Sequence, residues 1–413
     1  MTTYAPNPVV TFAGNVNYSD HTIADISINL GRRDVIEAVN AGYARITLWT
    51  PADQPLTVNL SESVTVSIDK GTSGTETIFT GIVSDIDLSL AQYGDIGSIA
   101  EYTITAVGPL AQLNKRLAGL SGYAKQDDGD RIFAILSEAF LTQWDDLSPT
   151  LTWSQLPNGV QWDQYDGVNQ VIVDNLTATI DRPGIYELTA YNDGAANALT
   201  LAQNAAQSGR GVLYEAGNGH LHYADYSSRA SAPTVTLTAD DILTDGLRTA
   251  AQWSEIVNDV TVTYKANAEK NARDETSIIS YGQLAGSRST QLENAADAQA
   301  QADDFLESRA YPRVYPESLR VALHNPNVSD ATRDALIAAE NGTAIVTDEL
   351  PAVFGTSFNG YLEGYSWRLT RYEAYIDLIC SAQSETYLSI IWQQIPPDLT
   401  WAAYNPSTKW SDL

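Results

Sequence analysis

Residues 43–49 read YARITLW, residues 64–68 read VTVSI and residues 78–85 read IFTGIVSD. Apolar and polar residues alternate in the first two stretches, which is the pattern of antiparallel strands with one buried face. Further along the chain, residues 255–264 read EIVNDVTVTY and residues 365–369 read YSWRL. The two groups of stretches have similar patterns of predicted strands, as two copies of one β-rich unit would have. They predict a mainly β chain with helical insertions, of the α+β class, containing two similar β-rich blocks.

The segment between the two blocks has a different pattern. Apolar residues at helical spacing predict a helix over residues 131–140, and an Ala-rich run predicts another over residues 195–208, ended by Gly209. Short apolar runs on either side of Asn218-Gly219 predict a hairpin, because this dipeptide suits a tight turn with positive φ. This segment is therefore predicted to be a mixed α/β insertion.

Length and pattern together divide the chain into four parts. A chain of 413 residues is expected to contain more than one domain. The predicted parts are residues 1–120 as the first β domain, 121–233 as a helix, a Trp-rich insertion and a helix-hairpin module, 234–392 as the second β domain with helical insertions, and 393–413 as an extended C-terminal docking segment. Further helices are expected at residues 109–116, 291–309 and 330–340, the last one with Ser329 as its N-cap.

The charge balance is strongly acidic, with 23 Lys and Arg against 51 Asp and Glu and a formal net charge of -28. Such a chain repels nucleic acid unless a local basic stripe compensates, and the sequence contains no basic run. The charge is typical of a soluble acidic protein, and it also fits a surface that lies near DNA without binding it. No run of about 18 apolar residues occurs. The N-terminus also lacks a signal-peptide pattern, so we expect cytoplasmic synthesis and no membrane-spanning segment.

Residues that could carry chemistry show no convincing pattern. Cys380 is the single cysteine and lies in an apolar run, which predicts a buried, unreactive thiol. His220 and His222 would point to one side of the hairpin strand, but no third ligand of a metal site is evident. We interpret Asp303-Asp304 as solvated charge on a helix. No phosphate loop, nucleophile elbow or zinc-protease motif appears, so we predict no catalytic residues, no cofactor and no metal ion.

A short Trp motif occurs twice. Leu-Thr-Trp ending at Trp153 is followed by Trp162, and Leu-Thr-Trp ending at Trp401 is followed by Trp410 at the same spacing. Because Trp is enriched among the energetically dominant residues of interfaces, these four residues are candidates for docking onto a partner. The alternative is that each segment packs on its own domain.

The order of short motifs in the two blocks resembles one known family. The first block contains GRRD at residues 31–34, FTGIVSDI at 79–86 and AVGPL at 106–110. The second contains VNDVTV at 257–262, followed by DETSI and YG within residues 274–282. In this order the motifs resemble the minor tail proteins, or baseplate hub proteins, of long-tailed (siphovirus-type) bacteriophages.

The resemblance implies two tube-like antiparallel β-barrel domains per chain and assembly as a homotrimer. Three chains would form a pseudo-sixfold ring that joins the hexameric tail tube to the threefold tail tip, with DNA and the tape-measure protein passing through its channel without specific binding. The implied neighbours are distal tail or tail-tube proteins above, and tail-tip, fibre or receptor-binding proteins below. The implied location is the virion tail tip, after synthesis in the host cytoplasm. Residues 142–190 have no counterpart in the family and are expected to be an outward-facing insertion.

Two other functions remain open from the sequence. Nine Trp, 22 Tyr and many carboxylates could belong to a carbohydrate-binding or glycan-cleaving tail-tip protein, because exposed aromatic rings stack on sugars. An acidic multidomain protein of the cytoplasm with no role in a virion is the third possibility. Detection of the chain in purified virions would separate this last alternative from the other two.

Overall fold

The structure is a computed structural model, and its described residues are 4–13, 16–19, 22–92, 97–140, 170–173, 176–228, 233–250, 253–265, 267–312, 315–354 and 357–382. The N-terminal block forms antiparallel strands, as its alternating pattern predicts. Along β5, Val64, Val66 and Ile68 are completely buried, while the residues between them are only partly covered. The strands of this block are β1 (Val9–Phe12), β2 (Val16–Ser19), β3 (Ile23–Gly31), β4 (Asn40–Pro51), β5 (Ser63–Asp69), β6 (Thr75–Gln92) and β7 (Ile99–Val107).

The C-terminal block supplies further strands to the same sheet. These are β16 (Thr234–Thr238), β17 (Ile242–Ala250), β21 (Tyr315–Ala322), β22 (Ala344–Asp348), β23 (Phe358–Leu369) and β24 (Ala374–Ala382). The helix α6 (Asp330–Ile337) lies between β21 and β22 in the sequence, and the Ser329 hydroxyl accepts a hydrogen bond from the Thr332 amide, as predicted for its N-cap. A short 3-10 turn, η7 (Ala352–Phe354), precedes β23.

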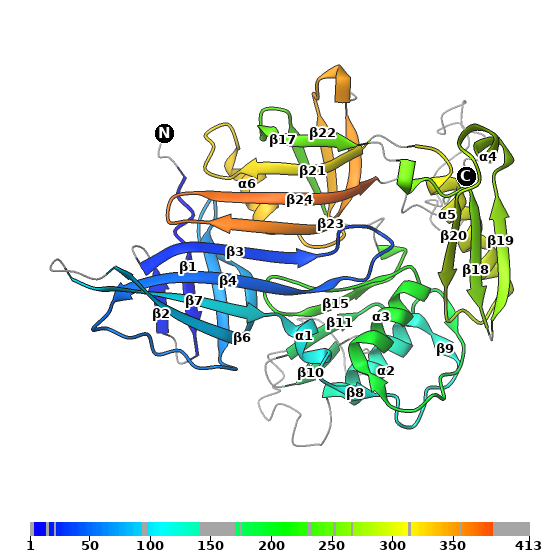
Figure 1. The fold of residues 1–413 in the computed structure, drawn as a ribbon, viewed down its shortest axis with the longest axis horizontal. Coiled ribbons are helices and arrows are strands. Elements are labelled where there is room, and N and C mark those ends of the chain that lie inside the picture. Colours follow the sequence, from blue (N-terminus) through cyan, green and yellow to red (C-terminus); the bar gives the residue numbers. More distant parts are fainter. Residues whose placement is uncertain are drawn as a thin grey trace, which may run out of the picture.

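Pairing between β3 and β23 joins the two blocks. These strands run antiparallel, from Gly31 opposite Gly364 to Ile26 opposite Leu369. The described strands form a 13-stranded sheet with the path β17-β21-β24-β23-β3-β4-β7-β6-β5-β1-β2, from which β22 and β16 branch at β23. Figure 1 shows β3 and β4 beside β23 and β24, although they come from opposite ends of the chain.

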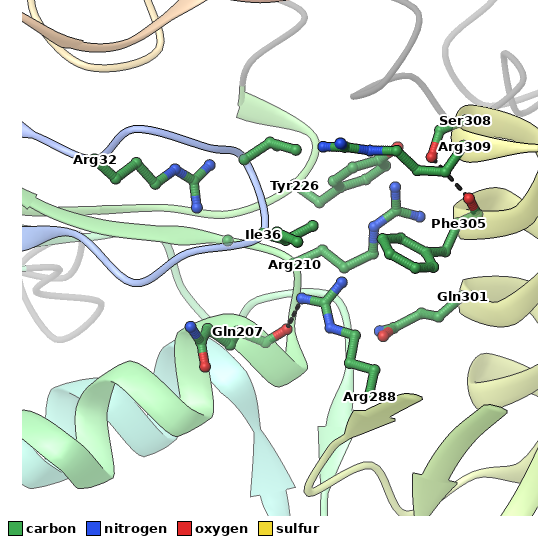
Figure 2. Close-up of a pocket in the computed structure, with 12 residues that line it drawn as sticks. Arg32, Ile36, Gln207, Arg210, Tyr226, Arg288, Gln301, Phe305, Ser308 and Arg309 are labelled. Carbon is green, nitrogen blue, oxygen red and sulfur yellow. Dashed lines mark hydrogen bonds between the residues drawn. The ribbon is translucent and has the colours of Figure 1, made fainter. Parts of the chain in front are cut away.

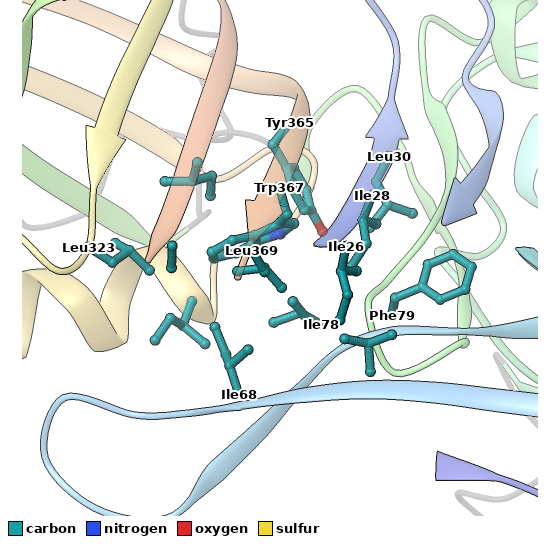
Figure 3. Packing of buried hydrophobic residues seen from close by; sticks show 14 of the residues in the cluster. Ile26, Ile28, Leu30, Ile68, Ile78, Phe79, Leu323, Tyr365, Trp367 and Leu369 are labelled. Carbon is teal, nitrogen blue, oxygen red and sulfur yellow. The ribbon is translucent and has the colours of Figure 1, made fainter. Parts of the chain in front are cut away.

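One hydrophobic core serves both blocks. Trp367 and Leu369 of β23 pack with Ile26 and Ile28 of β3, and Ile68 of β5 lies in the same cluster (Figure 3). The mainly β architecture is as predicted, but no sheet closes into a barrel within the described residues, whereas the family resemblance implied two barrels. The backbone N–H and C=O groups of β3 form hydrogen bonds with those of β23. The strands of the two blocks therefore continue into one open sheet.

The middle of the chain forms a second core around helices. Its elements are α1 (Pro109–Leu113), β8 (Leu117–Ala118), β9 (Gln126–Asp127), α2 (Asp128–Phe140), β10 (Gln170–Val173), β11 (Leu176–Ile180), β12 (Glu187–Leu188), β13 (Ala196–Asn197), α3 (Ala198–Ser208), β14 (Val212–Glu215) and β15 (Leu221–Ala224). The buried faces of α2 and α3 meet in this core through residues such as Ile132, Leu136 and Ala202.

Part of the second β block joins this helical core. The 3-10 turn η6 (Trp253–Glu255) is followed by β18 (Asp259–Tyr264), β19 (Ala268–Arg273), α4 (Glu275–Tyr281), β20 (Ala285–Ser289) and α5 (Ala295–Arg309). The strands β18, β19 and β20 form a separate three-stranded sheet among the described residues, and α5 packs on it. Buried Val260, Val262 and Ala302 belong to the same cluster as α2 and α3. Residues predicted as one β block therefore contribute to both cores.

The predicted helices and hairpin are observed, with small differences at their ends. The predicted helices at 109–116, 131–140, 195–208, 291–309 and 330–340 correspond to α1, α2, α3, α5 and α6. The predicted hairpin is β14–β15. The helix α4 was not predicted, although Asp274 caps it by accepting a hydrogen bond from the Ser277 amide and Gly282 ends it. No helix of the described residues is long and apolar enough to cross a membrane.

Candidate functional site

The four tryptophans predicted to dock a partner, Trp153, Trp162, Trp401 and Trp410, lie outside the described residues. Their role stays a prediction from the sequence. Residues 142–169, the major part of the segment expected to face outward, also lie outside the described residues. The described part of the chain contains three other kinds of candidate: titratable side chains, contacts that join the two cores, and exposed apolar strand ends.

His220 and His222 take part in packing within the hairpin. The ring of His222 stacks on Tyr214 with centroids 5.2 Å apart, and the two imidazoles are 6.4 Å apart. Burial lowers the pKa of both histidines. Within the described residues, no three His, Cys, Asp or Glu side chains form a group that could hold a metal ion. In the turn before His220, Asn218 is exposed, whereas Gly219 packs so closely on Thr80 of β6 that a Cβ atom would lie 2.9 Å from the Thr80 side chain.

The environments of Cys380 and of the Asp303-Asp304 pair test two further predictions. Cys380 is 4% exposed on β24, and burial raises the pKa of its thiol well above the ordinary value, so the predicted buried thiol is confirmed. Asp303 is exposed on α5, as predicted. The prediction was wrong for Asp304, which forms an ion pair with Arg210 and whose pKa is raised by burial. Asp304 follows Asp303 on α5 and points toward the body of the protein, where Arg210 lies in the turn after α3.

Asp128 is a completely buried carboxylate that was not among the candidates predicted from the sequence. Its Oδ1 accepts hydrogen bonds from the amides of Ile185 and Tyr186, both at 2.8 Å, and its Oδ2 accepts from the Tyr223 hydroxyl. Burial raises the pKa of Asp128 to about 6 against these hydrogen bonds, which favour the charged form. Both oxygens are used to hold the start of α2 against its neighbours, so the geometry assigns Asp128 a structural role.

Glu215 is a second buried carboxylate, and it lies where the large sheet meets the helical core. Its Oε1 accepts a hydrogen bond from the Gly42 amide of β4, and its Oε2 accepts one from the Leu110 amide of α1 at 2.9 Å. A Cβ atom at Gly108 would lie 2.2 Å from Oε1, so only glycine leaves room for this contact. Burial raises the pKa of Glu215 to about 7. Glu215 thus ties β14 to β4 and α1.

The GRRD motif at residues 31–34 is another junction. Gly31 has a φ of +91° and lies so close to β23 that a Cβ atom would be 2.4 Å from the Gly364 Cα. Arg32 forms an ion pair with Glu363 at 2.7 Å, with both side chains almost fully buried. Asp34 pairs with Arg309 at the end of α5, at 2.8 Å. The motif therefore links β3 to β23 and to the helix α5.

The outer ends of β6 and β7 expose apolar side chains. We call residues 86–92 and 97–103 the hairpin arm. It extends beyond the body of the protein at the left of Figure 1. Leu88 and Leu90 are 63% and 58% exposed, and they lie on one face of β6 because side chains alternate along a strand. Leu88 is opposite Tyr102 of β7. Large apolar side chains on an open strand face are typical of surfaces that bind other proteins.

Comparison of the sequence with protein-family models gives no match, and comparison with curated proteins gives none either. The fold, however, matches solved structures. One is the 43 kDa tail protein of prophage MuSo2 from Shewanella oneidensis, with a TM-score of 0.57 and 14% identity over 92% of this chain and 98% of that chain. Another is the tail protein from Neisseria meningitidis MC58, with a TM-score of 0.58 and 14% identity over 93% of this chain and 98% of that one. These matches confirm the resemblance to tail proteins that the order of the motifs indicated, and the chain has the fold of these two tail proteins.

Proposed function

We propose that this chain is a structural, non-enzymatic protein of a bacteriophage tail and that it forms the tail hub. The observation that carries the proposal is the similarity of the fold to two tail proteins over nearly the full length of each chain. In the proposed assembly, three chains form a pseudo-sixfold ring that joins the hexameric tail tube to the threefold tail tip. The ring lines the channel for DNA and the tape-measure protein.

The connection between the two β blocks supports this arrangement. In the proposal, residues 1–120 and 234–392 supply two tube-like units per chain, so three chains provide six units around one axis. The β3–β23 pairing and the buried Arg32–Glu363 pair hold strands of the two blocks in one sheet. A ring of six units requires a fixed angle between the two units of each chain, and a continuous sheet with one core resists bending between them.

The hairpin arm is the proposed contact with a neighbouring tail protein or a second copy. Leu88 and Leu90 lie on the same face of β6 as partly buried Ile86, so an apolar strip continues from the core out to the surface. Covering this strip would remove apolar area from water, which favours association. From the sequence we also propose that Trp401 and Trp410, within residues 393–413, dock onto a partner.

The acidic composition supports a position near DNA. A net charge of -28 makes nonspecific adhesion of DNA to the protein unfavourable, because binding requires clusters of basic side chains at the phosphates. In the proposed channel, this property would let DNA pass without being held. Replacing acidic residues on the channel side by lysine would therefore slow or stop passage.

Mass measurement of the purified chain, together with electron microscopy of the assembled tail, tests the proposal. The expected result is three copies per particle, centred on the tail axis between the tube and the tip. A chain that stays monomeric and lies away from the axis in the tail, or that is absent from purified virions, would contradict it. Deletion of residues 394–413 tests the docking segment: we expect the remaining chain to fold and tip assembly to fail. Normal tails from this variant would remove the docking role but leave the hub proposal standing.

A further inference from the structure

A small cavity of about 40 Å³ lies where the large sheet, the helical core and the small sheet meet. Four arginines from distant parts of the chain line it. Arg32 follows β3, Arg210 lies in the turn after α3, Arg288 is on β20 and Arg309 is the last residue of α5. Figure 2 shows their side chains approaching one space from different sides. The aromatic rings of Tyr226 and Phe305 form part of the wall, and Arg210 lies over the Tyr226 ring at 4.2 Å.

Three of the four arginines at this cavity form ion pairs with carboxylates. Arg32 pairs with Glu363, Arg210 with Asp304 and Arg309 with Asp34. Arg288 donates one hydrogen bond to the carbonyl oxygen of Gln207 at 2.9 Å, and no carboxylate of the described residues pairs with it. Arg288 is thus an arginine of this cavity for which the described residues supply no carboxylate partner, although the chain as a whole carries a net charge of -28.

The surroundings of Arg288 disfavour its own positive charge. Burial lowers its pKa to about 10, and the charges of Arg210 and Arg32 act in the same direction. Arg32, Arg210 and Arg288 line the same cavity, so their positive charges repel one another there. A negative group placed among them would offset this repulsion and could accept from Arg288 N–H groups for which the described residues supply no other acceptor.

Gln301 contributes a different feature of the site. Its side chain is 2% exposed, and its Nε2 donates to the Ser208 carbonyl oxygen at 2.8 Å, which fixes the orientation of the amide. Its Oε1 is buried and accepts no hydrogen bond from the described residues. A buried acceptor without a hydrogen-bond donor costs free energy of folding. A ligand that carries an O–H group could donate the missing hydrogen bond to Gln301 Oε1. The cavity thus offers several cationic donors and one neutral acceptor.

We propose that this cavity binds one small tetrahedral oxoanion that retains a proton, with hydrogen phosphate as the model ligand. Its unprotonated oxygens accept from Arg288 and the neighbouring guanidinium groups, and its hydroxyl donates to Gln301 Oε1. The planar fork of arginine suits such oxygens better than the point charge of lysine does. Because the four arginines come from elements of both cores, the bound anion links the large sheet to the small sheet and α5. The proposal does not depend on the function proposed above.

The test measures binding of inorganic phosphate to the full chain by isothermal titration calorimetry, and thermal unfolding with phosphate or chloride at equal ionic strength. We expect one phosphate per chain and a saturable rise of the unfolding temperature with phosphate, since a ligand of the folded state stabilises it by mass action. Acetate, which is planar and fully deprotonated at neutral pH, should bind more weakly. No binding of phosphate, or equal shifts with phosphate, acetate and chloride, would overturn the proposal.

Variants locate the binding at this cavity. Arg288→Gln should weaken phosphate binding by about 10- to 100-fold, which corresponds to losing a hydrogen bond to a charged group. The matched control is Arg368→Gln, which removes an exposed arginine of β23 and should bind phosphate as the unmodified chain does. Where Arg288→Gln does not fold, Arg288→Lys keeps the charge and loses the fork, and its phosphate affinity should fall. Unchanged affinity in the folded Arg288 variants would place the phosphate elsewhere and overturn the proposal.

Discussion

The buried carboxylate of Glu215 predicts a pH dependence of stability that one substitution should remove. Burial raises the pKa of this side chain from 4.5 to about 7 in the folded chain. Below about pH 4.5 the group is protonated in both the folded and the unfolded state. Between the two pKa values the folded chain holds the proton and the unfolded chain does not, so folding is favoured at the lower pH and stability falls as the pH rises through the folded pKa.

The size of the effect follows from the two pKa values. The difference between 4.5 and about 7 corresponds to about 3 kcal/mol of unfolding free energy, of which about 2.5 kcal/mol is lost between about pH 5 and about pH 8. Glu215→Gln has a similar shape and does not titrate. It also turns an amide N–H₂ toward one of the two backbone donors at Gly42 and Leu110, which costs about 1–3 kcal/mol at every pH.

The measurement is the unfolding free energy from urea titration at about pH 5 and about pH 8. The unmodified chain should lose about 2–3 kcal/mol more than Glu215→Gln does over this range. Other titrating groups, including Asp128, are present in both chains and cancel in the difference. The control Glu373→Gln changes an exposed glutamate in the turn between β23 and β24 and should leave the pH dependence unchanged. Equal pH dependence in the unmodified chain and Glu215→Gln would refute the reasoning.

Three further predictions concern the junctions and the surface. Gly31→Ala puts a methyl group 2.4 Å from a β23 backbone atom at positive φ, so it should lower the unfolding free energy by about 1–3 kcal/mol or more; an unchanged urea midpoint would contradict this. Glu363→Gln leaves the charge of Arg32 buried without its carboxylate and should cost about 3–5 kcal/mol in the same assay, whereas a loss under about 1 kcal/mol would mean that the pair is not holding β3 to β23. The double variant Leu88→Ser and Leu90→Ser should keep the unfolding temperature, because both side chains are exposed, and should reduce incorporation into tails; normal incorporation would show that the hairpin arm is not a contact.

Local sequence patterns predicted much of the secondary structure. The alternation of Val64, Val66 and Ile68 specifies a strand with one buried face, and these residues are completely buried in β5. The Asn218-Gly219 dipeptide correctly predicted the β14–β15 hairpin. The helix α4 was missed because its capping signal, Asp274, lies in a short polar stretch whose buried side is limited to Ser277. Short helices carry too few residues for a periodic apolar pattern to appear.

The residues that form the candidate sites could not be predicted in the same way. Asp304 was predicted to be solvated because its own helix face is polar, and its partner Arg210 comes from the turn after α3, which is distant in the sequence. No motif in the neighbouring sequence distinguishes Asp128 or Glu215. Their burial depends on which helices and strands pack over them. Acidic residues are abundant in this chain, so residue type alone could not separate these two carboxylates from the exposed ones.

The sequence by itself determined the class of the fold, the positions of most strands and helices, the burial of Cys380 and the resemblance to tail proteins. Each of these depends on local periodicity, on single capping or turn residues, or on the order of short motifs. Only the tertiary structure decided that β3 pairs with β23, that residues 259–309 join the helical core and that four arginines meet at one cavity. The physical reason is that alternation determines which face of a strand is buried, whereas the choice of neighbour depends on backbone hydrogen bonds and packing between segments distant in the chain.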